Sequence, residues 1–374
     1  MYYKDGPRQQ LKKVFWFFSS EKNTFLILAQ MSQRNGGLVL GMAGTDAILE
    51  ALRVLAPRLC AGATDVEGLT RLTGGASQET WRFELTGPGV GATQILRRRA
   101  GGDASQGSAS IDLPTEAALM RLAARQGVKV PPVRHVCAPG DGLGEAVIVG
   151  FVPGETLGRR IVDGAAFAGV RPLLAAQAGD ALARIHAADL AAAPALPRMG
   201  AVETLDWYET AFHRSGACRP VLELAFRVLR RDMPPPVAPS LVHGDFRTGN
   251  LMIDPAAGLV AVLDWELAHI GDPAEDIGWL CVNSWRFGAV KKRAGGFGGL
   301  EAVLAAYAAA GGTPPSEARV CYWQMLGSLK WAVMCLTMYE IFRSGADPSL
   351  ERAAIGRRVS ECEADLLALM EQAA

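Results

Sequence analysis

The chain has 374 residues, of which 49% are hydrophobic and 20% charged, so it can bury a large core and is not intrinsically disordered. Its 38 basic and 38 acidic residues give a formal net charge of zero, which argues against a dedicated nucleic-acid binder and a polybasic membrane anchor. At roughly 150 residues per domain, this length allows one large domain or two to three lobes.

The seven cysteines are odd in number, widely spaced and free of any Cys-x-x-Cys pair. This pattern excludes a disulfide framework and offers no zinc-ribbon spacing. We expect the cysteines to be small buried hydrophobes in a protein of the reducing cytoplasm.

The most apolar stretch, residues 326–342, contains Lys330 and Glu340, whose charges would be costly at bilayer depth. It therefore predicts a fully buried helix of a large domain, and we expect no membrane partner.

The first 40 residues differ in composition from the rest. They hold four of the eight lysines, and Ala29 is the only alanine before Ala43 in an otherwise alanine-rich chain. The segment is either a real extension or the result of a misassigned start codon, with translation beginning at Met31 or Met42. We favour the second explanation and treat residues 1–44 separately from the fold.

Residues 45–152 predict a small lobe dominated by antiparallel strands. Thr45-Asp46 offers a helix N-cap, and Pro57 ends the helical spacing that follows it. Alternating apolar residues then indicate strands joined by a glycine-rich loop and a Pro-Gly turn. The expected elements are a helix at 45–57, strands at 69–73, 80–85 and 93–99, a helix at 115–126 and an apolar run at 146–152.

Pro153-Gly154 is a natural boundary, and residues 153–374 predict a larger, mostly helical lobe. The expected helices are 175–188, 205–214, 221–231, 300–310, 317–342 and 350–372.

A strand hairpin interrupts these helices. Residues 251–253 and 260–263 predict its two strands, which are bridged by turn-forming residues. Asp245 and Asn250 precede the first strand, and Asp264 ends the second. Because a hairpin brings its open ends together, we expect Asp264 beside Asn250 and close to Asp245.

Two converging carboxylates repel unless a proton or a cation lies between them. The hard oxygen ligands of Asp and Asn suit Mg²⁺. The other aspartate is then free to accept a proton from an alcohol. Together these groups are what phosphoryl transfer requires.

His243-Gly244-Asp245, with Asn250 five residues on and Asp264-Trp265-Glu266 downstream, resembles the aminoglycoside phosphotransferase family. The wider string, HGDFRTGN…LDWELAHIGDP…DIGW, looks most like the branch related to the kinase-like N-terminal portion of certain acyl-CoA dehydrogenase fusion proteins. The resemblance spans residues 65–285 and implies an α+β, protein-kinase-like fold with a small antiparallel N-lobe and a larger helical C-lobe. It implies transfer of the γ-phosphate of ATP to a small-molecule hydroxyl with Mg²⁺, and no nucleic-acid partner.

The resemblance also implies roles for the residues of the catalytic segment. Asp245 matches the catalytic base, and Asn250 and Asp264 match the magnesium ligands. Arg247 lies beside the base, where it would either meet a phosphate or substrate anion or form a structural salt bridge.

For the nucleotide, the resemblance points to the small lobe. Glu116 matches the helix glutamate that pairs with the basic residue of the third strand. The glycine loop would face the phosphates with its backbone N–H groups, and the hinge backbone would hold adenine. These loop and hinge residues are Gly74, Gly75, Ala76, Ser77, Gly150, Phe151 and Val152.

One position departs from the family pattern. The third strand should present a lysine to the α/β-phosphates, but residues 94–99 contain none. Arg97 takes that place in the alternating pattern, and arginine binds phosphate bidentately with permanent charge. Arg98 or Arg99 would be the contact if the register slips.

Three nearby residues are expected to be structural. Asp276 would brace the catalytic loop, His243 would hydrogen-bond within it, and His186 would be a buried histidine with satisfied partners.

The acceptor is the least specified part. Residues 207–231 and 285–293 carry many arginines and few carboxylates, which favours a neutral or anionic acceptor such as a hydroxyacyl thioester. An aminoglycoside or macrolide resistance kinase is the alternative with the same chemistry. The missing lysine motivates a further alternative, a catalytically weak nucleotide-binding scaffold.

Overall fold

A computed structural model of the protein describes residues 38–72, 78–99 and 110–373. The chain divides into two compact units, and the main division falls between Pro153 and Gly154. The segment Gln126–Lys129 belongs to the large unit although it lies within the sequence of the small one. Met31 lies outside the described residues, whereas Met42 lies within the first described helix.

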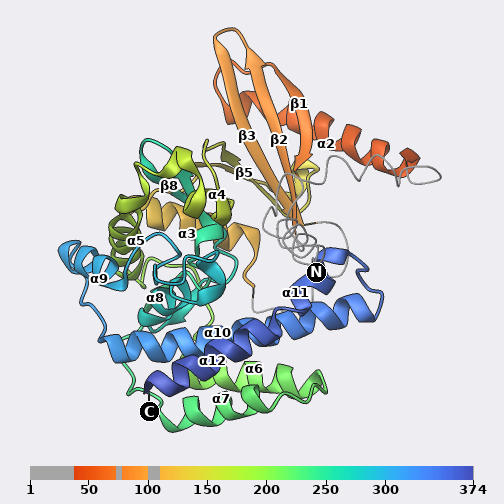
Figure 1. The fold of residues 1–374 in the computed structure, drawn as a ribbon. Coiled ribbons are helices and arrows are strands. Elements are labelled where there is room, and N and C mark those ends of the chain that lie inside the picture. Colours follow the sequence, from red (N-terminus) through yellow and green to blue (C-terminus); the bar gives the residue numbers. More distant parts are fainter. Residues whose placement is uncertain (1–37, 73–77, 100–109, 374) are drawn as a thin grey trace, which may run out of the picture. The chain divides into compact units, whose positions relative to one another are not determined.

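The small unit is built on a five-stranded antiparallel sheet with strand order β1-β2-β3-β5-β4 (Figure 1). Helix α2 packs against this sheet through a core that includes Leu52, Phe83 and Leu96. The predicted three-strand meander is confirmed by the antiparallel pairing of β1 with β2 and of β2 with β3. The elements of this unit are α2 (Leu38–Leu59), β1 (Asp65–Leu72), β2 (Gln78–Gly87), β3 (Val90–Arg99), α3 (Leu113–Arg125), β4 (Val133–Val136), the single turn η1 (Pro139–Asp141) and β5 (Ala146–Gly150).

Helix α2 is longer at both ends than the sequence predicts. It begins at Leu38, so Thr45 lies inside the helix and is not its N-cap. It also continues two residues past Pro57 to Leu59, so the proline lies in the last turn of the helix and does not end it. The Cys60 amide still donates to the Ala56 carbonyl at 3.2 Å.

The large unit is mostly helical, as predicted. Its elements are α4 (Gly158–Asp163), η2 (Ala165–Phe167), α5 (Arg171–His186), α6 (Ala201–Arg214), α7 (Pro220–Arg231), β6 (Ser240–Val242), η3 (Thr248–Asn250), β7 (Leu251–Asp254), β8 (Gly258–Val262), β9 (His269–Gly271), α8 (Ala274–Leu280), η4 (Asn283–Trp285), α9 (Leu300–Ala309), α10 (Glu317–Arg343), α11 (Leu350–Gly356) and α12 (Val359–Ala373).

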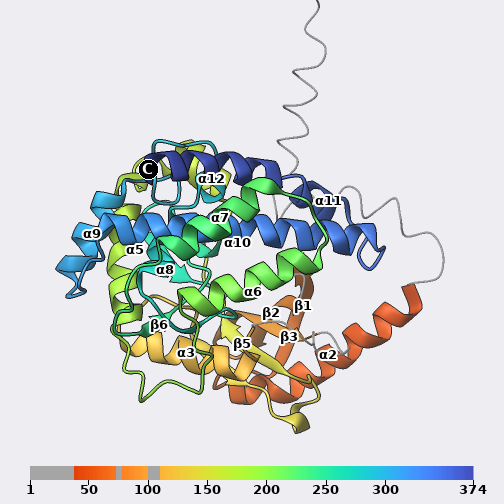
Figure 2. The same ribbon diagram turned by 90° about the horizontal axis from the view of Figure 1, so that it is seen from below.

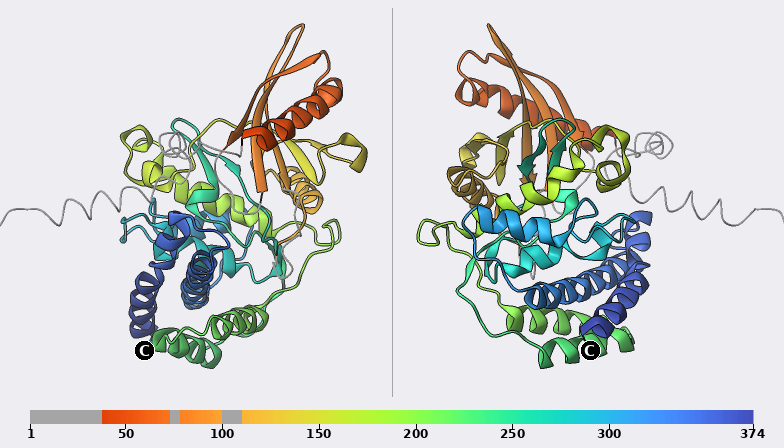
Figure 3. Two further views of the ribbon diagram at one scale, coloured as in Figure 1. Left: turned by 90° about the vertical axis from the view of Figure 1, so that its right-hand side faces the viewer. Right: turned by 60° about the vertical axis from the view of Figure 1, so that its left-hand side comes forward.

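The long helix α10 organises this unit. It packs beside α6, α7 and α12, and all four helices contribute to one hydrophobic core (Figures 2 and 3). Trp323 of α10, Phe212 of α6 and Phe226 of α7 are almost completely buried in that core. No helix in the described part of the chain combines the length and apolar character that a membrane crossing demands.

The single helix predicted over residues 350–372 is wrong, because the structure divides it into α11 and α12. At the break, the Arg357 and Arg358 amides donate to carbonyls only three residues back. Gly356 ends α11 where it approaches α10 closely, since a Cβ there would lie 2.6 Å from the Tyr339 Cβ. The chain forms a tighter turn of the 3₁₀ type here, and α12 begins after it.

The cysteines only partly match the expectation of burial. Cys218 is exposed, because it lies in the short solvated connection between α6 and α7. The buried cysteines are Cys281, Cys335 and Cys362, and the half-buried ones are Cys60, Cys137 and Cys321.

Candidate active site

The candidate catalytic loop follows strand β6, which pairs with β9 in a two-stranded antiparallel sheet. Within the His-Gly-Asp triplet, position 244 has no room for a side chain. Its φ is +78°, and a Cβ would lie 2.3 Å from the Leu267 carbonyl oxygen. The glycine thus lets the loop turn tightly and present Asp245.

The predicted hairpin is confirmed by the antiparallel pairing of β7 with β8, in which Leu251 lies opposite Val262. At its open end the Leu263 amide donates to the Asn250 carbonyl at 2.9 Å. Asp264 is the next residue and has a φ of +66°, which turns the chain out of the strand. Asn250 and Asp264 are therefore neighbours, as the hairpin geometry predicts.

Three side chains hold the Asp245 carboxylate. The Trp279 indole N–H donates to its Oδ1 at 2.7 Å, and the Asn250 Nδ2 donates to its Oδ2 at 2.5 Å. The Arg247 Nε lies 3.1 and 3.2 Å from the two oxygens. These donors orient the carboxylate and stabilise its charge.

Trp279 was missed as a site residue, because a tryptophan on a helix most often belongs to the core. It is indeed almost fully buried, yet its indole nitrogen reaches the candidate base. The signal in the sequence is its position three residues after Asp276, on the helix that follows the catalytic segment.

Arg247 was expected either to meet an anion or to form a structural salt bridge. In the structure it forms a salt bridge, and its partner is Asp245. The guanidinium also lies 4.8 Å from the ring centroid of Trp285. An arginine held over an aromatic face and paired with a carboxylate is fixed in position.

Asp276 braces the catalytic loop, as predicted. Its two oxygens accept the backbone N–H groups of His243 at 2.8 Å and of Gly244 at 2.9 Å. His186 bonds to the same carboxylate at 3.1 Å and to the Tyr307 hydroxyl at 2.9 Å, which confirms a buried, satisfied histidine. Burial alone would raise the pKa of Asp276, but these hydrogen bonds hold it below its usual value.

His243 connects the loop to the hairpin. Burial lowers the pKa of its imidazole, although three nearby carboxylates favour the charged form. The neutral ring accepts the Asp245 amide at Nδ1, 3.2 Å away, so its Nε2–H donates to the Leu263 carbonyl at 3.0 Å. One side chain thus links the base to the strand that carries Asp264.

Lys330 of α10 supports the loop from behind and was not predicted to do so. Its Nζ donates to the Gly244 carbonyl at 3.1 Å, lies 3.7 Å from Glu275 Oε1 and sits 4.7 Å from the Trp279 ring centroid. Burial alone would lower its pKa, but Tyr208 and the surrounding carboxylates raise it above the usual value. The buried ammonium therefore stays charged.

Asn250 and Asp264 have donor atoms that fit a hard divalent cation. Asn250 uses its Nδ2 to bond Asp245, so its Oδ1 is the oxygen that remains for a cation. Asp264 adds a carboxylate at the adjacent end of the hairpin. An amide oxygen and a carboxylate oxygen suit Mg²⁺, which fills its remaining positions with water and phosphate.

In the small unit, Arg97 and Glu116 form the expected pair, with Nη1 and Oε2 2.8 Å apart. Glu116 is buried and also accepts a hydrogen bond from Gln78 at 3.1 Å. Arg98 and Arg99 pair with other glutamates. The strand register therefore places Arg97, and neither Arg98 nor Arg99, against Glu116.

The other predicted nucleotide contacts are placed only in part. The loop residues Gly74, Gly75, Ala76 and Ser77 lie outside the described residues.

At the predicted hinge, residues 150–152, the Gly150 amide donates to the Pro132 carbonyl at 2.8 Å. The Phe151 amide donates to the Thr93 carbonyl at 3.2 Å. These two N–H groups are therefore committed to the small unit. The Val152 amide has no backbone acceptor among the described residues.

A profile of the phosphotransferase enzyme family matches residues 68–323. The chain belongs to this family. The phosphotransferase is 29% identical over 203 residues to acyl-CoA dehydrogenase family member 10 of Mus musculus. That match covers 50% of this chain and only 18% of the mouse protein.

Two solved structures share the fold. A putative aminoglycoside phosphotransferase from Ralstonia eutropha matches with a TM-score of 0.69 and 20% identity, covering 86% of this chain and 98% of that one. A macrolide 2'-phosphotransferase from Brachybacterium faecium matches with a TM-score of 0.57 and 22% identity, covering 82% and 97%. The two-lobed, protein-kinase-like fold is thereby confirmed.

Several of the arginines that favoured an anionic acceptor have partners within the protein. Arg286 is buried and donates to the Cys281 carbonyl at 2.6 Å. Arg293 pairs with Glu317 at 2.7 Å, and Arg230 pairs with two carboxylates of α6. A count of charges along the sequence does not show such partners, so it is weak support for the charge of the acceptor.

Proposed function

We propose that this phosphotransferase moves the γ-phosphate of ATP to a hydroxyl group of a small molecule. The observation that carries the proposal is the Asp245 carboxylate, held by three donors beside Asn250 and Asp264. Asp245 accepts the hydroxyl proton while the alcohol oxygen bonds to the γ-phosphorus and the bond to the ADP oxygen breaks. Asn250 and Asp264 would hold Mg²⁺, whose charge would neutralise that of the phosphates.

For the nucleotide, we propose that Arg97 contacts the phosphates while Glu116 holds its guanidinium in place. The 2.8 Å pair supports this role, because an oriented arginine binds two phosphate oxygens at once. A catalytically weak nucleotide-binding scaffold, motivated by the missing lysine, is the alternative. Residues 74–77 over the phosphates and Val152 at adenine complete the proposed nucleotide site.

For the acceptor, we propose a neutral or anionic hydroxy compound, with hydroxyacyl-CoA as the first candidate. The support is Arg247, a guanidinium fixed over Trp285 next to the base, which suits an anionic or planar group better than a polycation. The mouse relative is named as a member of the acyl-CoA dehydrogenase family, which is further support for an acyl-CoA acceptor. The names of the two solved structures keep aminoglycosides and macrolides as the alternative acceptors.

The test is transfer of label from γ-labelled ATP, with Mg²⁺, to a panel of hydroxyacyl-CoAs, aminoglycosides, macrolides and sugars. At least one acceptor should become labelled, and Asp245→Asn should slow the transfer at least ~100-fold. Asp163→Asn, which changes an exposed aspartate of α4, is the matched control. Binding of ATP and Mg²⁺ without transfer to any acceptor would favour the nucleotide-binding scaffold.

A further inference from the structure

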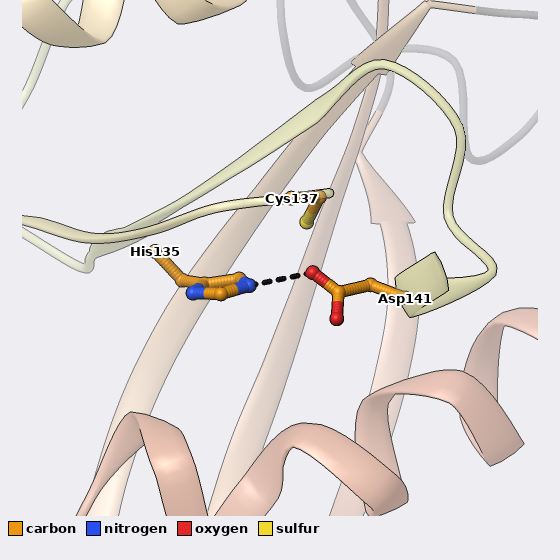
Figure 4. A group of neighbouring side chains, drawn as sticks. All are labelled: His135, Cys137 and Asp141. Carbon is orange, nitrogen blue, oxygen red and sulfur yellow. Dashed lines mark hydrogen bonds and ion pairs between the residues drawn. The ribbon is translucent and has the colours of Figure 1, made fainter. Parts of the chain in front are cut away.

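A second set of metal-ligating side chains lies in the small unit, outside the residues assigned to phosphotransfer. His135, Cys137 and Asp141 place a ring nitrogen, a sulfur and a carboxylate oxygen within 4.8 Å of one another (Figure 4). The side chains point toward a common space, and all three come from one stretch of seven residues.

The local backbone explains why these residues meet. His135 lies at the end of β4, and Cys137 follows two residues later, so both project from the same side of the extended chain. The Cys137 amide donates to the Ala146 carbonyl of β5 at 2.9 Å, which fixes its position. The turn η1 then brings Asp141 back, with its amide bonded to the Ala138 carbonyl at 3.0 Å.

We propose that His135, Cys137 and Asp141 bind a zinc ion, with water as the fourth ligand. Imidazole, thiolate and carboxylate are the three ligand types that Zn²⁺ uses in proteins. Zinc has no geometric preference of its own, and soft sulfur together with imidazole selects it over Mg²⁺ or Ca²⁺. The site is independent of the proposed phosphotransfer.

The existing contacts are compatible with an ion at this position. Asp141 Oδ2 lies 2.7 Å from His135 Nε2, which is the contact that the ion would replace. Arg58 bonds to the other oxygen, Oδ1, at 3.0 Å and would remain outside the ligand set. The Asp141 side chain is only 8% exposed and that of His135 17%, so both ligand side chains are largely shielded from bulk solvent.

The protonation states of Asp141 and Cys137 determine which protons leave when zinc binds. Hydrogen bonds from His135 and the Ala138 amide lower the pKa of Asp141 to about 2, so the carboxylate is charged. Burial raises the pKa of the Cys137 thiol to about 11, so the metal-free sulfur carries a proton. When the zinc–sulfur bond forms, the S–H bond breaks and that proton passes to the solvent. The proton that His135 Nε2 shares with Asp141 moves to Nδ1, which leaves the Nε2 lone pair for zinc.

The ion would act as a structural clamp. It would tie the end of β4 to the η1 turn, and Arg58 would extend the connection to α2. Because zinc binds the folded arrangement of ligands, it would stabilise the small unit against unfolding.

The test is a titration of the metal-free full-length chain with Co²⁺, which replaces Zn²⁺ and gives a sulfur-to-metal charge-transfer band in the near ultraviolet. We expect one equivalent of Co²⁺ to produce the band and Zn²⁺ to abolish it. Cys137→Ser should remove the band, and His135→Ala and Asp141→Asn should weaken binding at least about tenfold. Cys218→Ser, at the exposed cysteine, should leave the band unchanged.

A second measurement guards against a variant that fails to fold. The thermal unfolding midpoint of the wild-type chain should rise with added Zn²⁺, whereas that of Cys137→Ser should not, with circular dichroism reporting on its fold. The absence of a charge-transfer band in the wild type, a band that survives Cys137→Ser, or an equal thermal shift in both chains would overturn the proposal.

Discussion

The hydrogen bond from Trp279 to Asp245 gives a quantitative prediction for Trp279→Phe. The substitution keeps an aromatic ring in place but removes the N–H that lies 2.7 Å from Asp245 Oδ1. A hydrogen bond to a charged group contributes about 1.5–3 kcal/mol. Each ~1.36 kcal/mol is tenfold in rate, so kcat should fall roughly 10- to 150-fold if the bond orients the base.

The assay is steady-state phosphotransfer, with kcat and KM for ATP measured separately. KM for ATP should change little, because Trp279 acts on the base and not on the nucleotide. Trp331→Phe is the matched control. Its indole packs against Trp279 and Trp285, but its N–H has no partner among the described residues. If both variants lose activity equally, ring packing and not the hydrogen bond explains the effect, and the reasoning fails.

Three further predictions follow from individual contacts. Lys330→Met leaves His269 as the remaining basic partner of buried Glu275 and removes the donor to the Gly244 carbonyl, so it should lower the free energy of unfolding by about 1–3 kcal/mol in urea denaturation; an unchanged free energy of unfolding would contradict the supporting role of Lys330. Arg97→Ala should raise KM for ATP more than it lowers kcat, in contrast to Asp245→Asn, and an unchanged KM would exclude Arg97 from the nucleotide site. Burial lowers the pKa of His269, but the nearby Glu275 carboxylate raises it by more, so the pKa lies above its usual value. The stability that His269 contributes should therefore be complete below pH ~6.5 and decline as the pH rises through its higher folded pKa; a wild-type advantage over His269→Gln that grows above pH ~6.5 would refute this.

The parts of the site that sequence reasoning located are those set by local spacing. The hairpin of β7 and β8 follows from two short apolar runs around a turn, and its closure places Asn250 beside Asp264. Asp276 was expected to brace the loop because a buried carboxylate near backbone amides accepts their hydrogen bonds. The hairpin inference needs only the geometry of one segment, whereas Asp276 reaches the loop from 32 and 33 residues away.

The missed residues depend on packing between distant segments. Periodicity predicts that Lys330 and Trp279 are buried, but it does not predict which atoms their polar ends reach. Both approach the catalytic loop from other helices, and 86 residues separate Lys330 from Gly244. Only the folded packing of α8 and α10 against the loop brings these groups together.

Charge counts failed for a similar reason. The sequence contains many arginines between residues 207 and 293, but their partners belong to other elements or to backbone carbonyls. The cluster of His135, Cys137 and Asp141 was also missed, because its irregular spacing matches no common zinc pattern. A single turn of η1 brings its members together.

The most direct test of the central claim is phosphorus NMR of the reaction between ATP, Mg²⁺ and the best acceptor from the panel. The account predicts that wild-type protein forms a phosphate monoester and ADP in equal amounts. With Asp245→Asn, the ester should form at least ~100-fold more slowly. Ester formation at the same rate in both chains would contradict the role of Asp245 as the base on which the account depends.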